Sequence, residues 1–382
     1  MRFTVKTANL REAIAKVERV VSKQTTLPIL GNILISTENG RMAVSATNLE
    51  IAIKTYVGAK IEEEGNLTVP ARIINGFLGT IKDDVIEGTK IDDDLEITSE
   101  NHKIRIKGID AKDFPIIPEM PKQSFFNLNA VDFTKAAASV LVSVAHNDTR
   151  QELNGVFIKL EEDSLVMAAT DSFRLSEAIV GLDKKSISEE YRLFMDKNPS
   201  IIIPGLTLAE LQRIAGTEEL SFTVDQNQLF IKSNSVKLIS RLINGNYPEY
   251  RQILPQSFDV TVMIDKEQLV NAIKIASLVA SNQNGEVHLS SSEDKKSVIV
   301  SSQSIDTGEN ISTIPAEIDG PGFEVIFNCR YILDGLGIAL LDSSKVFLKL
   351  NQQKSPVILK AVDDKVKEKD GFSYVIMPII KG

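Results

Sequence analysis

The chain is poor in residues on which many protein functions depend. It contains one cysteine, three histidines and no tryptophan among 382 residues. The single cysteine, Cys329, excludes an intrachain disulfide framework and is expected to be a small buried thiol in a reducing compartment. No apolar run approaches the roughly 18 residues of a membrane-spanning helix, and the N-terminal MRFTVKTANLREA lacks the apolar stretch of an export signal. These absences predict a cytoplasmic protein.

Recognisable catalytic and metal-binding patterns are absent as well. None of the three histidines is flanked by further ligands at metal-site spacing: His102, His146 and His288. Nucleophile-elbow, zinc-protease, phosphate-loop and dinucleotide-binding motifs do not occur. The acidic run Asp92–Asp94 is interpreted as a solvated turn, because it lacks the further oxygen ligands of a calcium loop. The sequence therefore predicts no enzymatic activity, no metal and no cofactor.

The net charge is negative, at −9, with an isoelectric point near 5.2. Taken alone, this charge argues against nucleic-acid binding, because such proteins usually carry a strongly basic face. Net charge describes only the far field, however, and basic residues can still gather on one surface.

Three segments share one pattern, in which a short alternating strand leads into an amphipathic helix. They begin at Arg2, Phe125 and Thr261. In each segment apolar residues recur at helical spacing, which indicates a helix packed on a sheet. The expected core positions are Leu10, Ala13, Ile14, Val17, Val20 and Val21, then Phe133, Ala136, Ala137, Val140 and Val144, then Leu269, Ala272, Ile273, Ala276 and Val279.

A second helix is predicted in each repeat, after Val69-Pro70, Ile203-Pro204 and Phe327-Asn328. The offset of 123 residues between Phe3 and Phe126 also relates Ala46-Thr47-Asn48 to Ala169-Thr170-Asp171. We therefore predict an α+β protein of three similar domains, each with two helices on an antiparallel sheet. Proline-bearing segments separate the periodic stretches, and they place the domains at residues 1–122, 123–256 and 257–382.

Several strings resemble the bacterial DNA polymerase III beta subunit, the DNA sliding clamp family. They occur in order along the whole chain, at Thr26–Asn32, Ala169–Leu175, Leu242–Pro255, Phe327–Leu333 and Tyr374–Ile379. The resemblance implies a head-to-tail homodimer with six similar domains in a ring. Helices would line the hole and sheets would form the outside. The implied function is that of a processivity factor, which encircles duplex DNA and tethers the replicative polymerase.

Basic residues on the helices are candidates for the DNA-facing surface. Lys16, Arg19 and Lys23 recur at i, i+3 and i+7, away from the core stripe of the first helix. Such cations would contact phosphates without reading bases, which gives weak, salt-dependent and sequence-independent binding. The full predicted set is Arg11, Lys16, Arg19, Lys23, Arg72, Lys82, Lys135, Asn147, Arg150, Arg213, Lys266, Lys274 and Arg330. Gln151 and Glu152 stand where better-known family members carry aromatic residues.

The resemblance also implies a dimer interface and a peptide-binding groove. The interface would join the alternating strand Lys103, Ile104, Arg105, Ile106 and Lys107 to Leu278, Val279, Asp306 and Glu309. The groove would bind short hydrophobic motifs of the polymerase, the clamp loader and other partners. Its predicted residues are Leu153, Thr170, Ser172, Phe173, Arg174, Leu175, Pro248, Gln252, Ile253, Val375, Ile376, Met377, Pro378 and Ile379.

Two other functions are compatible with the same repeats. The first is a three-repeat scaffold that does not encircle DNA, which would be a monomer or an open assembly. The second is an enzyme with its site between the second and third repeats, near Asp171 and Arg174. That enzyme would need a perturbed acid–base pair, and no base or nucleophile lies near Asp171 in the sequence.

Overall fold

The computed structural model describes residues 1–21, 27–38, 40–146, 148–280, 285–337, 343–351, 355–363, 365, 367–368 and 370–380. The chain forms two compact units. The first comprises Met1–Thr134, Leu182–Lys197 and Leu206–Leu242, and the second comprises Lys135–Gly181, Asn198–Gly205 and Ile243–Gly382. The predicted second repeat thus contributes residues to both units.

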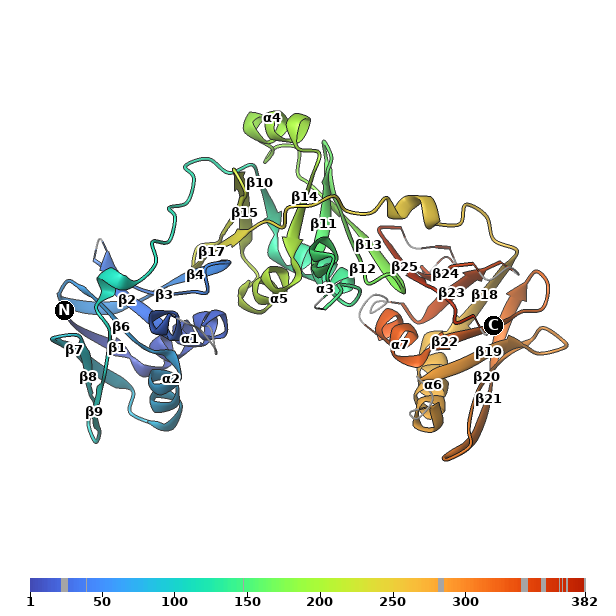
Figure 1. Cartoon of the computed structure of the whole chain (residues 1–382), viewed down its shortest axis with the longest axis horizontal. Helices are drawn as coiled ribbons and strands as arrows, with labels where there is room; N and C mark the ends of the chain where they lie inside the picture. Colours follow the sequence, from blue (N-terminus) through green and yellow to red (C-terminus); the bar gives the residue numbers. More distant parts are fainter. Residues whose placement is uncertain are drawn as a thin grey trace. The chain divides into compact units, whose positions relative to one another are not determined.

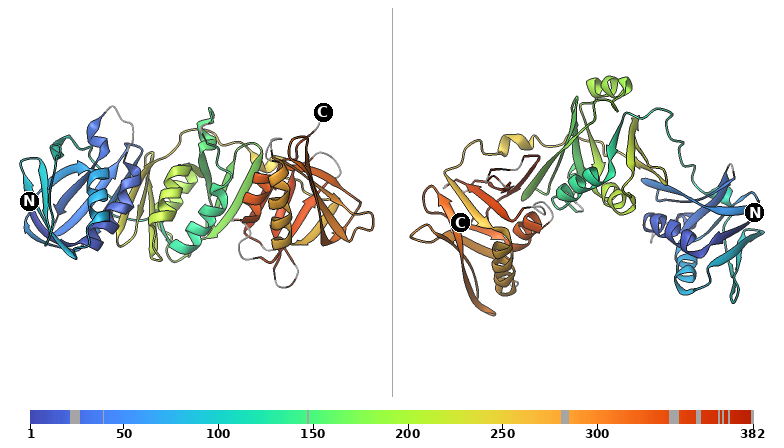
Figure 2. Two further views of the ribbon diagram at one scale, coloured as in Figure 1. Left: turned by 90° about the horizontal axis from the view of Figure 1, so that it is seen from below. Right: turned by 180° about the vertical axis from the view of Figure 1, so that it is seen from behind.

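Among its described residues, the N-terminal repeat has two α-helices and contributes strands to two antiparallel sheets (Figure 1). Its elements are β1 Arg2–Lys6, α1 Thr7–Val17, β2 Asn32–Glu38, β3 Arg41–Thr47, β4 Ile51–Val57, β5 Ala59–Glu63, β6 Asn66–Pro70, α2 Ala71–Thr80, β7 Val85–Ile91, β8 Asp94–Thr98 and β9 Lys103–Ile106. One sheet has the strand order β5-β1-β7-β8-β9. Helices α1 and α2 pack side by side (Figures 1 and 2).

The middle repeat follows the same plan with one added helix. Its elements are β10 Phe126–Asn129, α3 Ala130–Leu141, β11 Gly155–Leu160, β12 Ser164–Thr170, β13 Arg174–Gly181, α4 Glu189–Lys197, β14 Ser200–Pro204, α5 Gly205–Ile214, β15 Glu219–Asp225, β16 Gln228–Lys232 and β17 Val236–Arg241. The helix α4 is not predicted from the repeat pattern, because the other two repeats have no counterpart among the described elements. Its Tyr191 is fully buried against Phe125 and Phe126.

The C-terminal repeat completes the chain. Its elements are β18 Val260–Asp265, α6 Lys266–Ala280, β19 Glu286–Ser291, β20 Ser297–Ser304, β21 Gly308–Asp319, β22 Glu324–Asn328, α7 Cys329–Gly337, β23 Lys345–Leu350, β24 Val357–Ala361 and β25 Phe372–Ile376. Helix α6 packs against α7 and against β20 and β21 (Figure 2). No helix in the described part of the chain is both long and apolar enough to cross a membrane.

The predicted strand–helix repeat is confirmed at the level of individual residues. Strands β1, β10 and β18 each lead directly into a helix, and their equivalent residues Phe3, Phe126 and Val262 are buried. The apolar stripe of each following helix is also buried, with three exceptions. Val21, Ala136 and Val279 are only half-buried. The second helix of each repeat begins directly after Pro70, Pro204 and Asn328, as predicted.

Two equivalent turns confirm the 123-residue offset between the first two repeats. In each turn a threonine hydroxyl donates to the carbonyl four residues on, Thr47 to Ile51 and Thr170 to Arg174. The following Asn48 or Asp171 accepts two backbone N–H groups through Oδ1. The next residues, Leu49 and Ser172, have left-handed φ angles of 77° and 76°. These polar residues therefore close the same strand-to-strand turn twice.

Two larger sheets join strands from consecutive repeats. In the first unit, β17 pairs with β4 in the order β10-β15-β16-β17-β4-β3-β2-β6. In the second unit, β13 pairs with β25 in the order β14-β11-β12-β13-β25-β24-β23-β18-β21-β20-β19-β22. Backbone hydrogen bonds thus continue across each boundary between repeats.

The acidic run at residues 92–94 is only partly the solvated turn that the sequence predicts. Asp92 and Asp93 are exposed, and Asp92 has a left-handed φ of 55°. Asp94 is buried and accepts hydrogen bonds from Arg105 and Lys107 at 2.8 Å each. Hydrogen bonding to Lys107 lowers the pKa of this carboxyl. The prediction was wrong for Asp94, because Arg105 in β9 and Lys107 just after it bind this carboxylate and replace its water.

Candidate functional site

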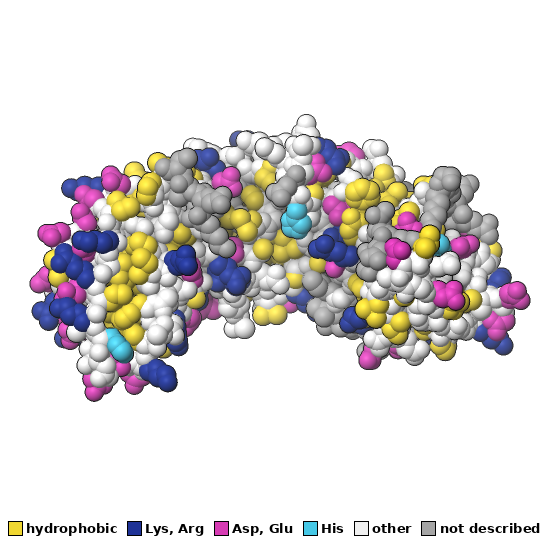
Figure 3. Space-filling model, turned by 60° about the horizontal axis from the view of Figure 1, so that its bottom comes forward, with side chains coloured by type: hydrophobic (Ala, Val, Ile, Leu, Met, Phe, Trp, Pro, Cys, Tyr) yellow, Lys and Arg dark blue, Asp and Glu magenta, His cyan; other side chains and the backbone are white. Residues whose placement is uncertain are grey.

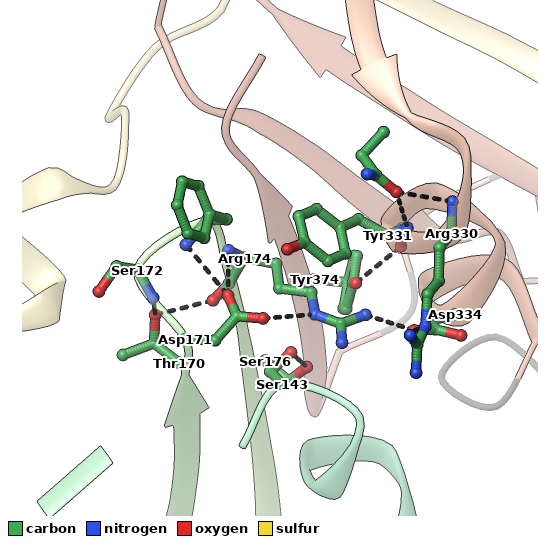
Figure 4. Close-up of polar contacts among 12 residues, drawn as sticks. Ser143, Thr170, Asp171, Ser172, Arg174, Ser176, Arg330, Tyr331, Asp334 and Tyr374 are labelled. Carbon is green, nitrogen blue, oxygen red and sulfur yellow. Dashed lines mark hydrogen bonds and ion pairs between the residues drawn. The ribbon is translucent and has the colours of Figure 1, made fainter. Parts of the chain in front are cut away.

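The predicted peptide-groove residues around Arg174 form a connected polar network (Figure 4). The guanidinium of Arg174 donates through Nε to Asp171 Oδ2 at 3.0 Å and through Nη1 to Asp334 Oδ2. Its carbon Cζ lies 4.5 Å from the centre of the Tyr331 ring. The side chain of Arg174 is only 8% exposed. Although burial opposes its charge, hydrogen bonding to Asp334 raises the pKa of Arg174 above its ordinary value.

Tyr331 connects this network to an exposed aromatic residue. Phe173 stacks on Tyr331 with ring centres 6.2 Å apart, and the Phe173 side chain remains 59% exposed. The backbone carbonyl of Tyr331 accepts from the buried Tyr374 hydroxyl at 2.7 Å. The β12–β13 turn, α7 and β25 therefore meet around one cation. Figure 4 shows the side chains of this network pointing toward one another.

The segment before β18 is fixed to the same strands by tyrosines. The Tyr247 hydroxyl accepts from the backbone N–H of Thr170 at 3.0 Å. The Tyr250 hydroxyl donates to Glu177 at 2.5 Å. Burial raises the pKa of both tyrosines. These contacts hold a short 3-10 turn, Tyr250–Ile253, against the sheet. The side chain of Ile253, at the end of this turn, remains 53% exposed.

The predicted groove set divides into exposed and buried residues. Ser172, Phe173, Pro248, Gln252 and Ile253 are exposed, and Met377, Pro378 and Ile379 are half-buried. The remaining members are buried: Leu153, Thr170, Arg174, Leu175, Val375 and Ile376. They support the surface from below and do not offer their side chains to a ligand. After β25, the backbone N–H groups of Met377 and Ile379 donate to the carbonyls of Phe173 and Ile326, each at 2.8 Å.

Most predicted DNA-facing residues are exposed on or next to helices. Arg11, Arg19, Arg72, Lys82, Lys135, Arg150, Lys274 and Arg330 are exposed, whereas Lys16 and Lys266 are half-buried. Figure 3 shows Lys and Arg side chains distributed over the face that it presents. Arg150 donates to Asp148 and to the Ser172 hydroxyl at 2.9 Å, so it also contacts the peptide-site turn. Lys23 and Asn147 lie outside the described residues.

Arg213 differs from the other predicted cations. Its guanidinium donates to the backbone carbonyls of Ala15 and Lys16 at 2.8 and 2.7 Å, and to the Glu210 carboxylate. Arginine near a helix C-terminus satisfies carbonyls that have no partner within the helix. Arg213 therefore connects α5 to the end of α1, and its charge is paired with Glu210. Its place among the cations directed at DNA stays a prediction.

The predicted interface strand β9 is an edge strand of the first unit. It pairs with β8, and no described strand pairs with its other side. Lys103, Arg105 and Lys107 are exposed, while Ile104 is half-buried and Ile106 is only 2% exposed. The side chain of Ile106 belongs to the chain's own core. The expectation that it faces a second subunit was therefore wrong.

The C-terminal interface residues lie on α6 and on the β20–β21 hairpin. Leu278 is 75% exposed, and Asp306 and Glu309 are exposed near the hairpin tip. Exposed apolar residues of the same region were missed: Ile275 on α6, Ile305 at the hairpin tip and Ile311 on β21. The alternation of β21 could have indicated Ile311 from the sequence. Tyr331 and Asp334 were also missed at the peptide site, because no local pattern relates them to Arg174, which lies far from them in the chain.

Among the described residues, no group of three His, Cys, Asp or Glu side chains is placed to hold a metal ion. The thiol of Cys329 is partly buried, and burial raises its pKa, which disfavours the reactive thiolate.

Comparisons with known proteins cover the chain almost completely. Models of the N-terminal, central and C-terminal domains of the DNA polymerase III beta subunit match residues 1–118, 127–249 and 251–380. The beta sliding clamps of Synechococcus elongatus and Staphylococcus aureus are 28% and 29% identical, with 99% of each chain covered. The DNA polymerase sliding clamp of Bacillus subtilis has a TM-score of 0.90 at 24% identity, with both chains fully covered. A Pseudomonas aeruginosa sliding clamp bound to griselimycin has a TM-score of 0.87 at 23% identity, also over both full chains. The chain therefore belongs to the DNA polymerase III beta subunit family, the beta sliding clamps.

Proposed function

We propose that this chain is a DNA sliding clamp, a non-catalytic accessory subunit that closes into a ring around duplex DNA and tethers the replicative polymerase. The ring is a head-to-tail homodimer of three-domain chains, with domain boundaries near residues 122 and 256, and it acts in the cytoplasm. The observation that carries the proposal is the match of all three family domains, in order, along one chain.

Two free strand edges support the head-to-tail ring. One side of β9 is unpaired among the described strands. Among the described strands, residues 308–315 of β21 pair only with β20, and residues 316–319 pair with β18. An unpaired edge is a ready template for another strand. Pairing β9 of one subunit with the free part of the partner's β21 removes both edges, and the two different surfaces give the head-to-tail direction.

Charge and apolar surface at these edges are complementary. Strand β9 carries exposed basic residues, and the tip of the β20–β21 hairpin carries Asp306 and Glu309. Exposed apolar residues lie on the adjoining helices, with Ile73 on α2 at 50% and Leu278 on α6 at 75%. Burial of such side chains supplies most of the association free energy, and the charges set the partner and the register.

The exposed cations of the helices support contact with the DNA backbone. Lysine and arginine bind phosphate without reading the bases, and their binding weakens as salt rises. The net charge of −9 repels DNA at a distance. The duplex is therefore held by the closed ring and contacts the helices only weakly, which permits sliding.

The surface around Phe173 and Ile253 supports binding of a short hydrophobic motif from the polymerase or the clamp loader. Both side chains are more than half exposed, and they are held by the Arg174 and Tyr250 contacts described above. Met377, whose backbone N–H donates to the Phe173 carbonyl, has a flexible side chain that adapts readily to different ligands. Each buried anchor contributes about 1.5–3 kcal/mol. Two or three anchors therefore support an affinity of about micromolar after the costs of association.

The test asks whether the protein encircles DNA, because a closed ring can leave a linear molecule but not a circular one. The protein is loaded onto a nicked circular plasmid by a clamp loader and ATP, and the complex is isolated by gel filtration. We expect the protein to stay with the circle and to be lost when one restriction cut makes the plasmid linear. Retention that does not depend on circularity, or no retention at all, would favour the scaffold that does not encircle DNA.

A further inference from the structure

Asparagine followed by glycine is prone to lose ammonia spontaneously. Glycine has no Cβ, so its backbone nitrogen can approach the preceding side chain and close a five-membered ring. The ring closes only where the local backbone can rotate and the amide is not held by other groups. The dipeptide occurs five times in the chain: Asn39-Gly40, Asn75-Gly76, Asn154-Gly155, Asn244-Gly245 and Asn284-Gly285. The first and last of these asparagines lie outside the described residues.

Asn75-Gly76 is held within helix α2. The side-chain amide of Asn75 donates to the Glu18 carboxylate. In a helix, each backbone N–H donates to the carbonyl four residues earlier. This hydrogen bond and the helical backbone keep the nitrogen of Gly76 away from the Asn75 side chain, so the folded chain protects this dipeptide.

Asn154-Gly155 is held by hydrogen bonds and by burial. The side chain of Asn154 accepts from the backbone N–H of Asp148 and donates to the Asp148 carbonyl, each at 3.0 Å. Gly155 is buried at the start of β11, where it is directly opposite Pro204 of β14. Ring closure would break both hydrogen bonds and displace a buried strand, so this dipeptide is protected as well.

Asn244-Gly245 has none of these restraints. Both residues are exposed and lie outside the helices and strands. No described residue forms a hydrogen bond with the side chain of Asn244 or with the backbone N–H of Gly245. The chain is fixed just before them, where the N–H of Ile243 donates to the carbonyl of Ile202 at 2.9 Å, and after them at Tyr247.

We propose that Asn244 is a site of spontaneous deamidation whose product weakens the adjoining peptide site; the effect on peptide binding rests on the proposed function. The backbone nitrogen of Gly245 loses its proton and attacks Cγ of Asn244. The new N–Cγ bond forms, the Cγ–Nδ2 bond breaks, and ammonia leaves. Water then opens the cyclic imide at either carbonyl and gives aspartate or isoaspartate. Each step is a substitution or a hydrolysis and needs no oxidant or reductant.

Isoaspartate changes the length of the segment that carries the tyrosine anchors. One side-chain carbon enters the main chain and lengthens it by about 1.5 Å. The insertion falls between the fixed Ile243 and Tyr247, whose hydroxyl holds the N–H of Thr170. Thr170 begins the turn that presents Phe173. A longer connection therefore displaces Tyr247 from this turn or strains it, and the peptide site loses part of its support.

Both products also add a negative charge beside an existing one. Gly245 lies next to Glu152, because a Cβ on this glycine would be 3.4 Å from the Glu152 Cβ. Like charges at short range repel each other. The repulsion acts in the same direction as the longer main chain, since it favours movement of the modified segment away from the sheet.

The first test measures the modification itself. The full chain is incubated at neutral and at mildly alkaline pH and digested, and the fragments are separated and weighed by mass spectrometry. The fragment with residue 244 should gain the mass of an amide NH2 replaced by OH and should split into aspartate and isoaspartate forms. It should do so faster than the fragments with Asn75 and Asn154, and faster at the higher pH, because the attacking nitrogen must lose its proton. In urea-unfolded chain the three sites should react at similar rates.

The second test measures the effect on the peptide site. Calorimetry with a polymerase-tail peptide compares fresh chain, aged chain and an aged Asn244→Ser variant, which cannot form the ring. The number of functional sites in the aged wild type should fall by about the fraction of chains that carry isoaspartate. The aged variant should retain the binding of the fresh wild type.

Deamidation of the folded chain that is no faster at residue 244 than at Asn75 and Asn154 would overturn the proposal, whatever the peptide does. Full peptide binding by chains that have accumulated isoaspartate at residue 244 would overturn the effect on the site. Failure of the fresh chain to bind the peptide would instead count against the proposed function, and the mass measurement would still decide whether Asn244 is modified.

Discussion

Arg174 and Asp334 form an ion pair between the β12–β13 corner and helix α7. Asp171 binds the same guanidinium from its other side at 3.0 Å, and the Tyr331 ring covers it. A cation that is 8% exposed is tolerated because two carboxylates and an aromatic face replace its water. The pair connects the second and third repeats beneath the proposed peptide site.

Replacing this arginine should destabilise the second unit strongly. In Arg174→Ala, two carboxylates lose their buried partner, and breaking such a pair costs about 3–5 kcal/mol. Urea unfolding should show the loss. Arg251→Ala is a matched control, because Arg251 pairs with Glu177 but is 48% exposed, and exposed pairs contribute about 1 kcal/mol or less. Similar losses of unfolding free energy in both variants would contradict the idea that burial makes the Arg174 ion pairs the stronger ones.

Aspartate at Leu278 should dissociate the proposed dimer without unfolding the chain. The residue is 75% exposed in the single chain, so the folded subunit tolerates the charge, whereas an apolar interface does not. Sedimentation velocity should show a monomer for Leu278→Asp and for Ile73→Asp. The control Ile179→Asp carries the same change at a position that is 49% exposed in β13 and should remain dimeric. A dimer in all three variants would place the interface elsewhere.

Charge reversal on the helices should weaken DNA binding. Arg11→Glu/Arg19→Glu/Lys274→Glu changes three exposed residues. The affinity for duplex DNA should fall, and the dependence of log affinity on log salt should become shallower by about 0.9 for each phosphate that the variant no longer neutralises. Dimerisation should be unchanged. If Lys60→Glu/Lys112→Glu/Lys296→Glu has the same effect, total charge rather than the helical surface governs binding.

Removing either exposed anchor should weaken peptide binding while preserving the fold. Phe173→Ala and Ile253→Ser each remove a side chain that contributes about 1.5–3 kcal/mol when a ligand covers it. Calorimetry with a polymerase-tail peptide should therefore show an affinity about 10- to 100-fold lower. Ile179→Ser, with similar exposure on β13, should bind normally. Full affinity in the first two variants would remove this surface from the proposed function.

Alkaline pH should destabilise the second unit through its buried tyrosines. Burial raises the pKa of Tyr374, whose side chain is fully buried. Its contribution to stability is complete below the ordinary tyrosine pKa of about 10 and is lost as pH rises toward the folded value, since the unfolded state releases its proton first. In Tyr374→Phe, the fall in unfolding free energy above about pH 10 should be shallower by roughly 1.4 kcal/mol per pH unit. An unchanged slope in urea titrations would contradict this assignment.

The fold could be predicted where a periodic pattern repeats. The spacing of Leu10, Ala13 and Ile14 specifies the buried face of α1, and the shared offset relates Thr47 to Thr170. Helix α4 could not be predicted in this way, because the described elements of the other two repeats include no second copy for comparison.

The candidate site was predictable only in part, because it depends on contacts between residues far apart in the chain. Alternation shows that Ile104 and Ile106 share a face of β9, but not that the core of the same chain fills the space beside Ile106. The position of Asp334 next to Arg174 depends on how α7 packs against β25, and Arg213 reaches Ala15 only after α5 has docked. Such long-range contacts leave no local pattern in the sequence.

The pairing of β25 with β13 has a consequence for synthesis of the chain. Strand β13 ends at Gly181, whereas β25 begins at Phe372, and β25 lies between β13 and β24 in the sheet. During translation, one edge of β13 therefore stays unpaired until the whole third repeat has left the ribosome. Exposed strand edges in incomplete chains are prone to incorrect association. The nascent chain should therefore depend on protection by chaperones until its last strand arrives.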